Sequence, residues 1–348
     1  MDIRSLSKEE LTEELLSMGE KKFRAGQIFR WLHRDLADSF AEMTNLSLAL
    51  REKLSEKFSL EVPQAVQVLT SQIDGTKKFL FELADGNVIE SVWMRYHHGN
   101  SVCISSQVGC RMGCAFCAST LDGLVRGLTP AEMLGQVYQI QKLTGERVDS
   151  VVVMGSGEPL DNYDSLVRFI RLLTDPEGQD LSGRAITVST CGLVPQMYRL
   201  ADEGLSITLA LSLHASCDET RVRLMPVAKR YKLEEVLAAC DNYFEKTGRR
   251  VSYEYSLVHG VNDTLAEAKA LAGLLGGRNC HVNLIPVNPI KERNFTRGPR
   301  EETLAFKNML EKYGINATIR REMGRDIDGA CGQLRRSYME KGSEERRR

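Results

Sequence analysis

The feature that most constrains the fold is the alternation, from Ser101 onward, of short apolar runs with amphipathic stretches. The apolar runs have the length of strands, and apolar residues at helical spacing follow most of them. The six runs are Val102–Ser106, Val151–Met154, Ala185–Ser189, Ile207–Leu213, Val251–Leu257 and Val282–Pro286. This alternation predicts an α/β fold in which helices cover a parallel sheet. Because six βα units are too few to close an eight-stranded barrel, we expect an open partial (β/α)6 barrel.

The segments on either side of this core have a different character. Residues 1–60 show helical spacing throughout, and Phe23, Gln27 and Trp31 share one helix face. Residues 61–100 alternate like strands, with Asp-Gly pairs between the apolar runs, and so predict a short antiparallel meander. The expected organisation is a helical module (1–60), a β extension (61–100), a partial barrel with a C-terminal catalytic loop (101–334) and a charged tail (335–348).

Composition narrows the choice of partners. No apolar run reaches the roughly 18 residues that span a bilayer, and the N-terminus lacks the apolar stretch of a secretory signal, so we expect a cytoplasmic protein. A net charge of −1 leaves only local patches to attract nucleic acid. One patch lies beside Phe29 and Trp31, and the other is the tail; a solvated helix face and a frayed terminus are the simpler interpretations. The first patch comprises Lys21, Lys22, Arg24, Arg30, His33 and Arg34.

Three cysteines follow the first apolar run at the spacing C-x3-C-x2-C: Cys110, Cys114 and Cys117. Three thiolates can hold three irons of a 4Fe-4S cubane, and no fourth cysteine lies nearby. Structural zinc and iron–sulfur electron carriers normally use four protein ligands, so an open corner predicts a ligand from outside the protein. The alternative is a zinc knuckle that is completed by a distant histidine.

Polar residues end several of the later runs. Because the carboxyl ends of parallel strands meet at one edge, we expect these residues to share a site. Each has a simpler interpretation alone, as a glycine-rich turn or a structural histidine. They are Gly157 and Glu158 in GSGEP, Ser189, the triplet Ser212, Leu213 and His214, and Asn288. Together with the cysteine motif they resemble the radical S-adenosylmethionine (SAM) superfamily, which implies that they hold the amino group, ribose and adenine of SAM.

A longer series of motifs resembles one family within this superfamily. The strings are CISSQVGC, CRMGCAFCAS, GSGEPLDNY, SLHAS, LIPVNP and GRDIDGACGQL. In this order, and over nearly the whole chain, they are similar to the RlmN family. The resemblance implies methylation of C2 of an adenine in 23S rRNA and of an adenine in tRNA, with two SAM molecules used per turnover.

The resemblance also implies roles for three residues outside the cofactor motifs. Cys331 would carry a methyl group that becomes linked to the RNA, Glu90 would accept the C2 proton, and Cys103 would release the product by forming a disulfide with Cys331. It further implies flavodoxin or ferredoxin as electron donor, and an RNA-docking role for residues 1–60. We expect a monomer.

Two other functions stay open at this point. The related Cfr type methylates C8 of the same adenine; Pro159 in GEP and the string LIPVNP favour the RlmN type. A non-catalytic RNA-binding protein with an inert metal site is the second alternative, and it would have no use for Cys331 in a glycine-rich loop. The family often has serine where this chain has Cys191, which is either a harmless small residue or an oxidisable thiol. We expect no role for Cys217, Cys240 and Cys280.

Overall fold

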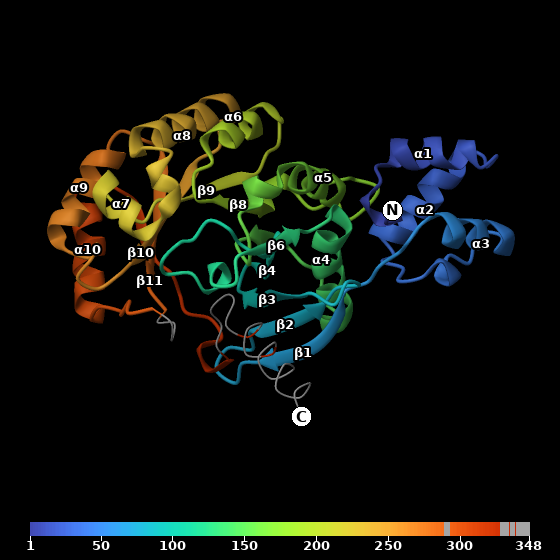
Figure 1. The fold of residues 1–348 in the computed structure, drawn as a ribbon, viewed down its shortest axis with the longest axis horizontal. Coiled ribbons are helices and arrows are strands. Elements are labelled where there is room, and N and C mark those ends of the chain that lie inside the picture. Colours follow the sequence, from blue (N-terminus) through green and yellow to red (C-terminus); the bar gives the residue numbers. More distant parts are fainter. Residues whose placement is uncertain (289–292, 328–333, 335–337, 339–348) are drawn as a thin grey trace.

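The structure, a computed structural model, describes residues 1–288, 293–327, 334 and 338. Its centre is a ten-stranded sheet in the order β1-β2-β3-β4-β7-β8-β9-β10-β11-β12 (Figure 1). Seven neighbouring strands are parallel. They are β4 (Gly99–Ile104), β7 (Ser150–Val153), β8 (Ile186–Thr190), β9 (Thr208–Ser212), β10 (Val251–Leu257), β11 (Cys280–Pro286) and β12 (Ala317–Ile319).

Helices connect the parallel strands and cover the outside of the sheet (Figure 1). They are α4 (Pro130–Thr144), α5 (Tyr163–Leu173), α6 (Val194–Asp202), α7 (Asp218–Leu224), α8 (Leu233–Thr247), α9 (Leu265–Leu275) and α10 (Arg300–Lys312). In the described residues the sheet does not close, because β1 and β12 are its two edges. The predicted open barrel of six βα units is therefore confirmed. β12 (Ala317–Ile319) adds a seventh parallel strand beyond the six predicted ones.

The predicted meander continues this sheet. Its strands are β1 (Gln64–Thr70), β2 (Lys77–Glu82) and β3 (Val88–Tyr96). Gly75 and Gly86 have φ angles of +73° and +78°, which suits the tight turns of the two hairpins. β3 then pairs antiparallel with β4, and β4 pairs parallel with β7. A single sheet therefore has an antiparallel half and a parallel half that meet at β4.

The N-terminal helices pack on the outer surface of the barrel, away from the sheet (Figure 1). They are α1 (Lys8–Ser17), α2 (Phe23–His33) and α3 (Leu48–Lys57). His33 and Phe29 belong to the buried face of α2, and the His33 ring contacts the Tyr138 hydroxyl of α4 at 3.0 Å. Burial lowers the pKa of His33 to about 3. His33 was therefore wrongly included in the basic patch: it is neutral and buried, whereas Lys21, Lys22, Arg30 and Arg34 are exposed.

The shorter elements complete the described part of the chain. β5 (Gln107–Gly109) and β6 (Leu124–Gly127) form a separate two-stranded ribbon. The 3-10 helices are Ile3–Ser5, Phe40–Glu42, Ala118–Thr120, Pro159–Asn162, Gly183–Ala185, Pro226–Lys229 and Arg325–Ile327. Over the described residues, no helix combines the length and the apolar character that crossing a bilayer requires.

Candidate active site

A cavity of about 640 Å³ opens at the carboxyl ends of the parallel strands and extends over the face of β3 and β4. Most of the residues predicted from sequence line it. These are Cys103, Cys110, Cys114, Cys117, Gly157, Glu158, Ser189, Ser212, His214 and Asn288. Glu90 and Leu213 are not among the lining residues, and Cys331 lies outside the described residues.

The loop that carries the three cysteines is closed at its base by the β5–β6 ribbon. The Cys110 amide donates to the carbonyl of Gly123 at 2.9 Å, just after Gly109 at the end of β5. Gly109 has a φ of +77°, and a Cβ there would lie 2.0 Å from the same carbonyl oxygen. Within the loop, the Thr120 hydroxyl donates to the Cys117 carbonyl at 2.9 Å. The backbone thus holds the cysteine loop in one shape, and only glycine fits at its entry.

The three thiols are not drawn together around a single ion. A tetrahedral zinc with Zn–S bonds of about 2.3 Å would hold its sulfurs about 3.8 Å apart. Among the described residues, Cys110, Cys114 and Cys117 do not form a group whose ligand atoms all lie within 4.8 Å of one another. Burial raises the pKa of Cys110 to about 12 and that of Cys114 well above its usual range. Burial thus favours the neutral thiols of Cys110 and Cys114, and binding of a metal centre would displace their protons.

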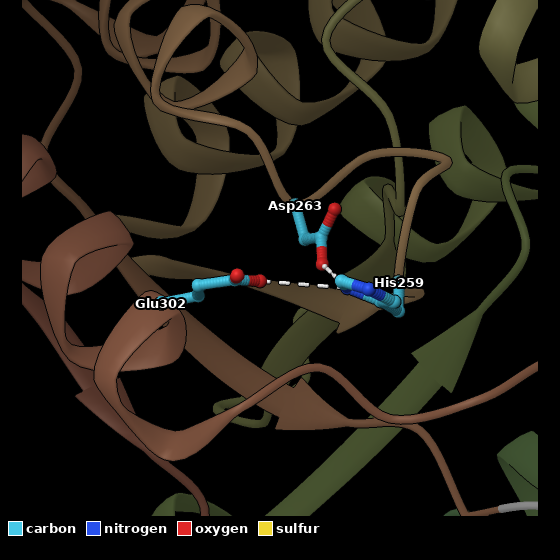
Figure 2. Close-up of side chains that lie close together, drawn as sticks. All are labelled: His259, Asp263 and Glu302. Atoms are coloured by element: carbon cyan, nitrogen blue, oxygen red, sulfur yellow. Dashed lines mark hydrogen bonds and ion pairs between the residues drawn. The ribbon is translucent and has the colours of Figure 1, made fainter.

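The described residues do contain one compact group of metal-ligand types, on the surface (Figure 2). His259 Nδ1 lies 2.9 Å from Asp263 Oδ2 and 3.4 Å from Glu302 Oε2. The side chains of His259 and Glu302 are about half exposed. The Asp263 carboxylate raises the pKa of His259, which favours the imidazolium. A solvated ion pair explains this group, and it contains no cysteine.

Glu158 is fixed at the end of β7 by the backbone. Its side chain is buried and accepts hydrogen bonds from the amides of Leu160 (3.1 Å) and Cys191 (2.7 Å). Burial nevertheless raises its pKa, so a cationic partner would stabilise the carboxylate. Next to it, a Cβ on Gly157 would lie 2.7 Å from the Gln107 side chain. A buried carboxylate beside a glycine turn fits the ammonium group of an amino acid such as SAM.

His214 directly follows the end of β9, which lies two strands along the sheet from β7. Its ring is held in one tautomer. Nδ1 accepts a hydrogen bond from the Ser256 amide at 2.9 Å, so the neutral ring carries its proton on Nε2. Burial lowers the pKa of His214 to about 3. The hydroxyls of Ser189 and Ser212 lie 3.4 Å apart. The Leu213 side chain, by contrast, is fully buried in the core, which is the face opposite to the cavity.

The antiparallel half contributes Cys103 and Glu90. Cys103 on β4 is paired with Val92 of β3, and both line the cavity. Glu90 precedes Val92 by two residues and so lies on the same face of β3. Its carboxylate is 3.2 Å from the Nζ atom of Lys78, and both side chains are buried. Lys78 was missed from sequence because it stands in a charged run, KK, at the start of β2.

A C-terminal strap, which we define as Gly324–Ile327, is fastened to the turn between β1 and β2. The Ser71 hydroxyl donates to Asp326 at 2.6 Å, and the Gln72 amide donates to the same carboxylate at 2.8 Å. The Gly324 amide donates to Asp74 at 2.9 Å. The Ser71 hydroxyl and the Gln72 amide lower the pKa of Asp326. The strap thus brings the chain from β12 back to the antiparallel half (Figure 1).

Several cavity residues were not identified from sequence. Glu254, in the middle of β10, is buried and accepts a hydrogen bond from the Asn283 amide group at 2.7 Å. The sequence could have identified Glu254, because it is the single acidic residue in a buried strand. Arg221 on α7 is buried behind the cavity, and nothing in its amphipathic helix distinguishes it from a surface residue. Four arginines also line the cavity: Arg297, Arg320, Arg321 and Arg325.

Residues 1–60 match the family described as ribosomal RNA large subunit methyltransferase N-terminal domain, and residues 104–272 match the radical SAM superfamily. A protein of Lachnospira eligens is 63% identical over 97% of both chains. One of Geobacillus kaustophilus is 54% identical over 96% of this chain and 92% of its own length. Each carries the name "Probable dual-specificity RNA methyltransferase RlmN".

Among solved structures, a radical SAM methyltransferase from Sphaerobacter thermophilus superposes with a TM-score of 0.92. It is 44% identical, and the match covers 96% of this chain and 98% of that one. The motifs, the open barrel and the full-length relatives agree with one another. The chain belongs to the RlmN family of radical SAM RNA methyltransferases.

Proposed function

We propose that this enzyme methylates C2 of an adenine in 23S rRNA and of an adenine in tRNA, through an intermediate in which Cys331 is joined to the RNA by a methylene group. One observation supports this most directly: Cys103 lines the same cavity as the three cysteines of the cluster motif. A protein that only generated radicals would need no further thiol there. Family membership supplies the RNA substrate.

In this proposal Cys110, Cys114 and Cys117 hold a 4Fe-4S cluster, and Glu158 binds the amino group of SAM at its open corner. Gly157 leaves room for the amino-acid part of SAM beside the main chain. The other contacts to SAM come from Ser189, Ser212, His214, Asn288 and the Leu213 backbone. When bound, the cluster and SAM supply a 5′-deoxyadenosyl radical. Two SAM molecules are used per turnover, one of them as the source of the methyl group.

The chain's own residues then carry the transfer. C2 of adenine is electron-poor, so the Cys331 methyl group must react as a carbon radical, after losing one hydrogen atom. Its bond to C2 leaves an unpaired electron on the base and makes the C2 proton acidic. Glu90 would accept that proton, and the electron would pass to the oxidised redox centre, which leaves a closed-shell adduct. The Cys103 thiolate attacks the Cys331 sulfur, and the bond between that sulfur and the methylene carbon breaks. That carbon takes up a proton to become the methyl group, and the methylated RNA leaves. The resulting disulfide needs two electrons from an external reductant.

The remaining partners follow from the same proposal. Flavodoxin or ferredoxin would supply electrons, and the enzyme would act as a monomer in the cytoplasm. The helical module would dock RNA through Lys21, Lys22, Arg24 and Arg30. Phe23 is exposed beside them, with the Arg24 guanidinium 4.9 Å from its ring centre, so an aromatic surface for stacking accompanies the charge.

The direct test uses the reconstituted enzyme with SAM, a reductant and an unmodified 23S rRNA fragment. Nucleosides are analysed by mass spectrometry against 2-methyladenosine and 8-methyladenosine. We expect 2-methyladenosine. 8-Methyladenosine would assign the enzyme to the Cfr type, and 5′-deoxyadenosine without a methylated base would refute the RNA substrate while keeping the radical chemistry.

The role of Cys103 has its own test. In Cys103→Ala the disulfide cannot form, so the RNA should stay joined to Cys331 and migrate with the protein on a denaturing gel. Cys240→Ala is the control, because that thiol is buried in the core on the other side of the sheet and does not line the cavity. Free methylated RNA at the normal rate from Cys103→Ala would show that Cys103 is not the resolving thiol.

A further inference from the structure

Arg221 is a buried cation behind the cavity. Its side chain is fully buried, and it donates hydrogen bonds to the carbonyls of Cys191 (2.7 Å), Ser212 (3.4 Å) and Leu213 (3.2 Å). These carbonyls belong to the segments that follow β8 and end β9. Within the described ranges, no carboxylate lies within 4.0 Å of the guanidinium. A buried charge without an anionic partner is costly, so its presence calls for an explanation.

One nitrogen of the guanidinium, Nη1, does not contact these carbonyls. Nη1 is buried, and it makes no hydrogen bond to any described residue. A buried N–H that finds no partner in the protein points to an acceptor that the protein binds.

The segment that carries Arg221 forms the back wall of the cysteine loop. Leu224, at the end of α7, accepts a hydrogen bond from the Ala115 amide at 2.8 Å. A Cβ on Gly113 would touch Pro226 at 3.4 Å. Cys114 packs against a buried apolar cluster that includes Cys191, and the Cys191 carbonyl accepts a hydrogen bond from Arg221. Arg221 therefore lies behind the segments against which the cysteine loop packs.

We propose that Arg221 is the counter-ion of the iron–sulfur centre, with Nη1 donating to a thiolate or sulfide at Cys114. This inference rests on the proposed cluster. One-electron reduction adds negative charge to such a centre, and hydrogen bonds and nearby cations raise its reduction potential. Arg221 then has two tasks: it joins the ends of β8 and β9, and it makes the centre easier to reduce. It is a positioning and electrostatic residue, not one that touches the RNA.

The test measures the reduction potential of the reconstituted protein by a redox titration followed by electron paramagnetic resonance, without SAM. Arg221→Gln removes the charge, and we expect a potential at least tenfold less favourable to the reduced form, which is 59 mV for one electron. Arg221→Lys keeps the charge but loses the planar fork, so its potential should lie between those of Arg221→Gln and the unaltered protein. Arg223→Gln is the matched control, since Arg223 is exposed on the same helix.

The outcomes separate the possibilities. If either Arg221 variant binds iron fully and keeps the original potential, Arg221 only joins the strand ends and the proposal is wrong. Should Arg221→Gln fail to fold, Arg221→Lys still decides the question. An unchanged potential with weaker SAM binding would assign Nη1 to the SAM carboxylate instead. A parent protein that binds no iron would overturn the proposed function itself, before any variant is compared.

Discussion

The two halves of the sheet organise the cavity in different ways. In the parallel half, Glu158 and His214 accept hydrogen bonds from the backbone amides of Cys191, just after β8, and of Ser256, on β10. In the antiparallel half, Glu90 is held by a lysine side chain, and the C-terminal strap is held by the turn of a hairpin. The half proposed to bind cofactors is thus fixed by the barrel backbone. The half proposed to handle the RNA depends instead on charged side chains: an ion pair between the adjacent strands β2 and β3, and the contacts of Asp74 and Asp326.

The largest expected effects come from two cysteine variants, which should separate SAM cleavage from methylation. Cys114→Ala should lower iron content and abolish both SAM cleavage and methylation. Cys331→Ala should abolish methylation equally but leave reductive cleavage of SAM to 5′-deoxyadenosine intact, because it removes only the methyl carrier. Both products can be quantified in one assay by liquid chromatography. Loss of SAM cleavage in Cys331→Ala would show that Cys331 does more than carry the methyl group.

The second test concerns the buried ion pair of the antiparallel half. Lys78→Met leaves the Glu90 carboxylate buried without its cation, and should lower the free energy of unfolding by about 3–5 kcal/mol. The double variant Lys78→Met/Glu90→Leu should recover most of that loss, since no charge is then left alone. Lys307→Met, which breaks the exposed pair with Glu311, should cost less than about 0.5 kcal/mol. Urea unfolding measures all three, and equal losses for the two lysines would contradict a buried pair.

The third test concerns acid sensitivity in the parallel half. The pKa of His214 is about 3 in the folded protein and about 6.5 when unfolded, so the unfolded chain binds its proton first as pH falls. This costs stability from about pH 6.5 down to 3, and amounts to about 2 kcal/mol at pH 5. His214→Gln removes the proton site but keeps an acceptor for the Ser256 amide. Between pH 7 and 5 it should therefore lose about 2 kcal/mol less than the parent, as measured by denaturant unfolding at each pH.

The smallest expected effect concerns the C-terminal strap. Asp326→Asn weakens the bonds from Ser71 and Gln72, so the Gln72 amide should exchange its hydrogen faster and methylation should fall severalfold. Acid should act in the same direction, because the pKa of Asp326 is lowered in the folded protein. The carboxylate holds the strap at any pH above the ordinary aspartate pKa, and it releases the strap as the pH falls through the lowered pKa. Asp85→Asn, in the other hairpin turn, is the control. Faster exchange without loss of methylation would mean that the strap does not position the catalytic loop.

The sequence by itself determined the open barrel, the cysteine loop and most of the polar rim. These features are local, because the alternation of apolar runs fixes the strands, and parallel strands must end at one edge. Only the tertiary structure decided what lies behind that rim. The Lys78–Glu90 pair, the strap on Ser71 and Asp74, the burial of His33 and the buried guanidinium of Arg221 all depend on contacts between separate elements of the fold. Charged residues look alike in a sequence whether they face water or another charge, and burial, which decides between the two, is a property of the packed fold.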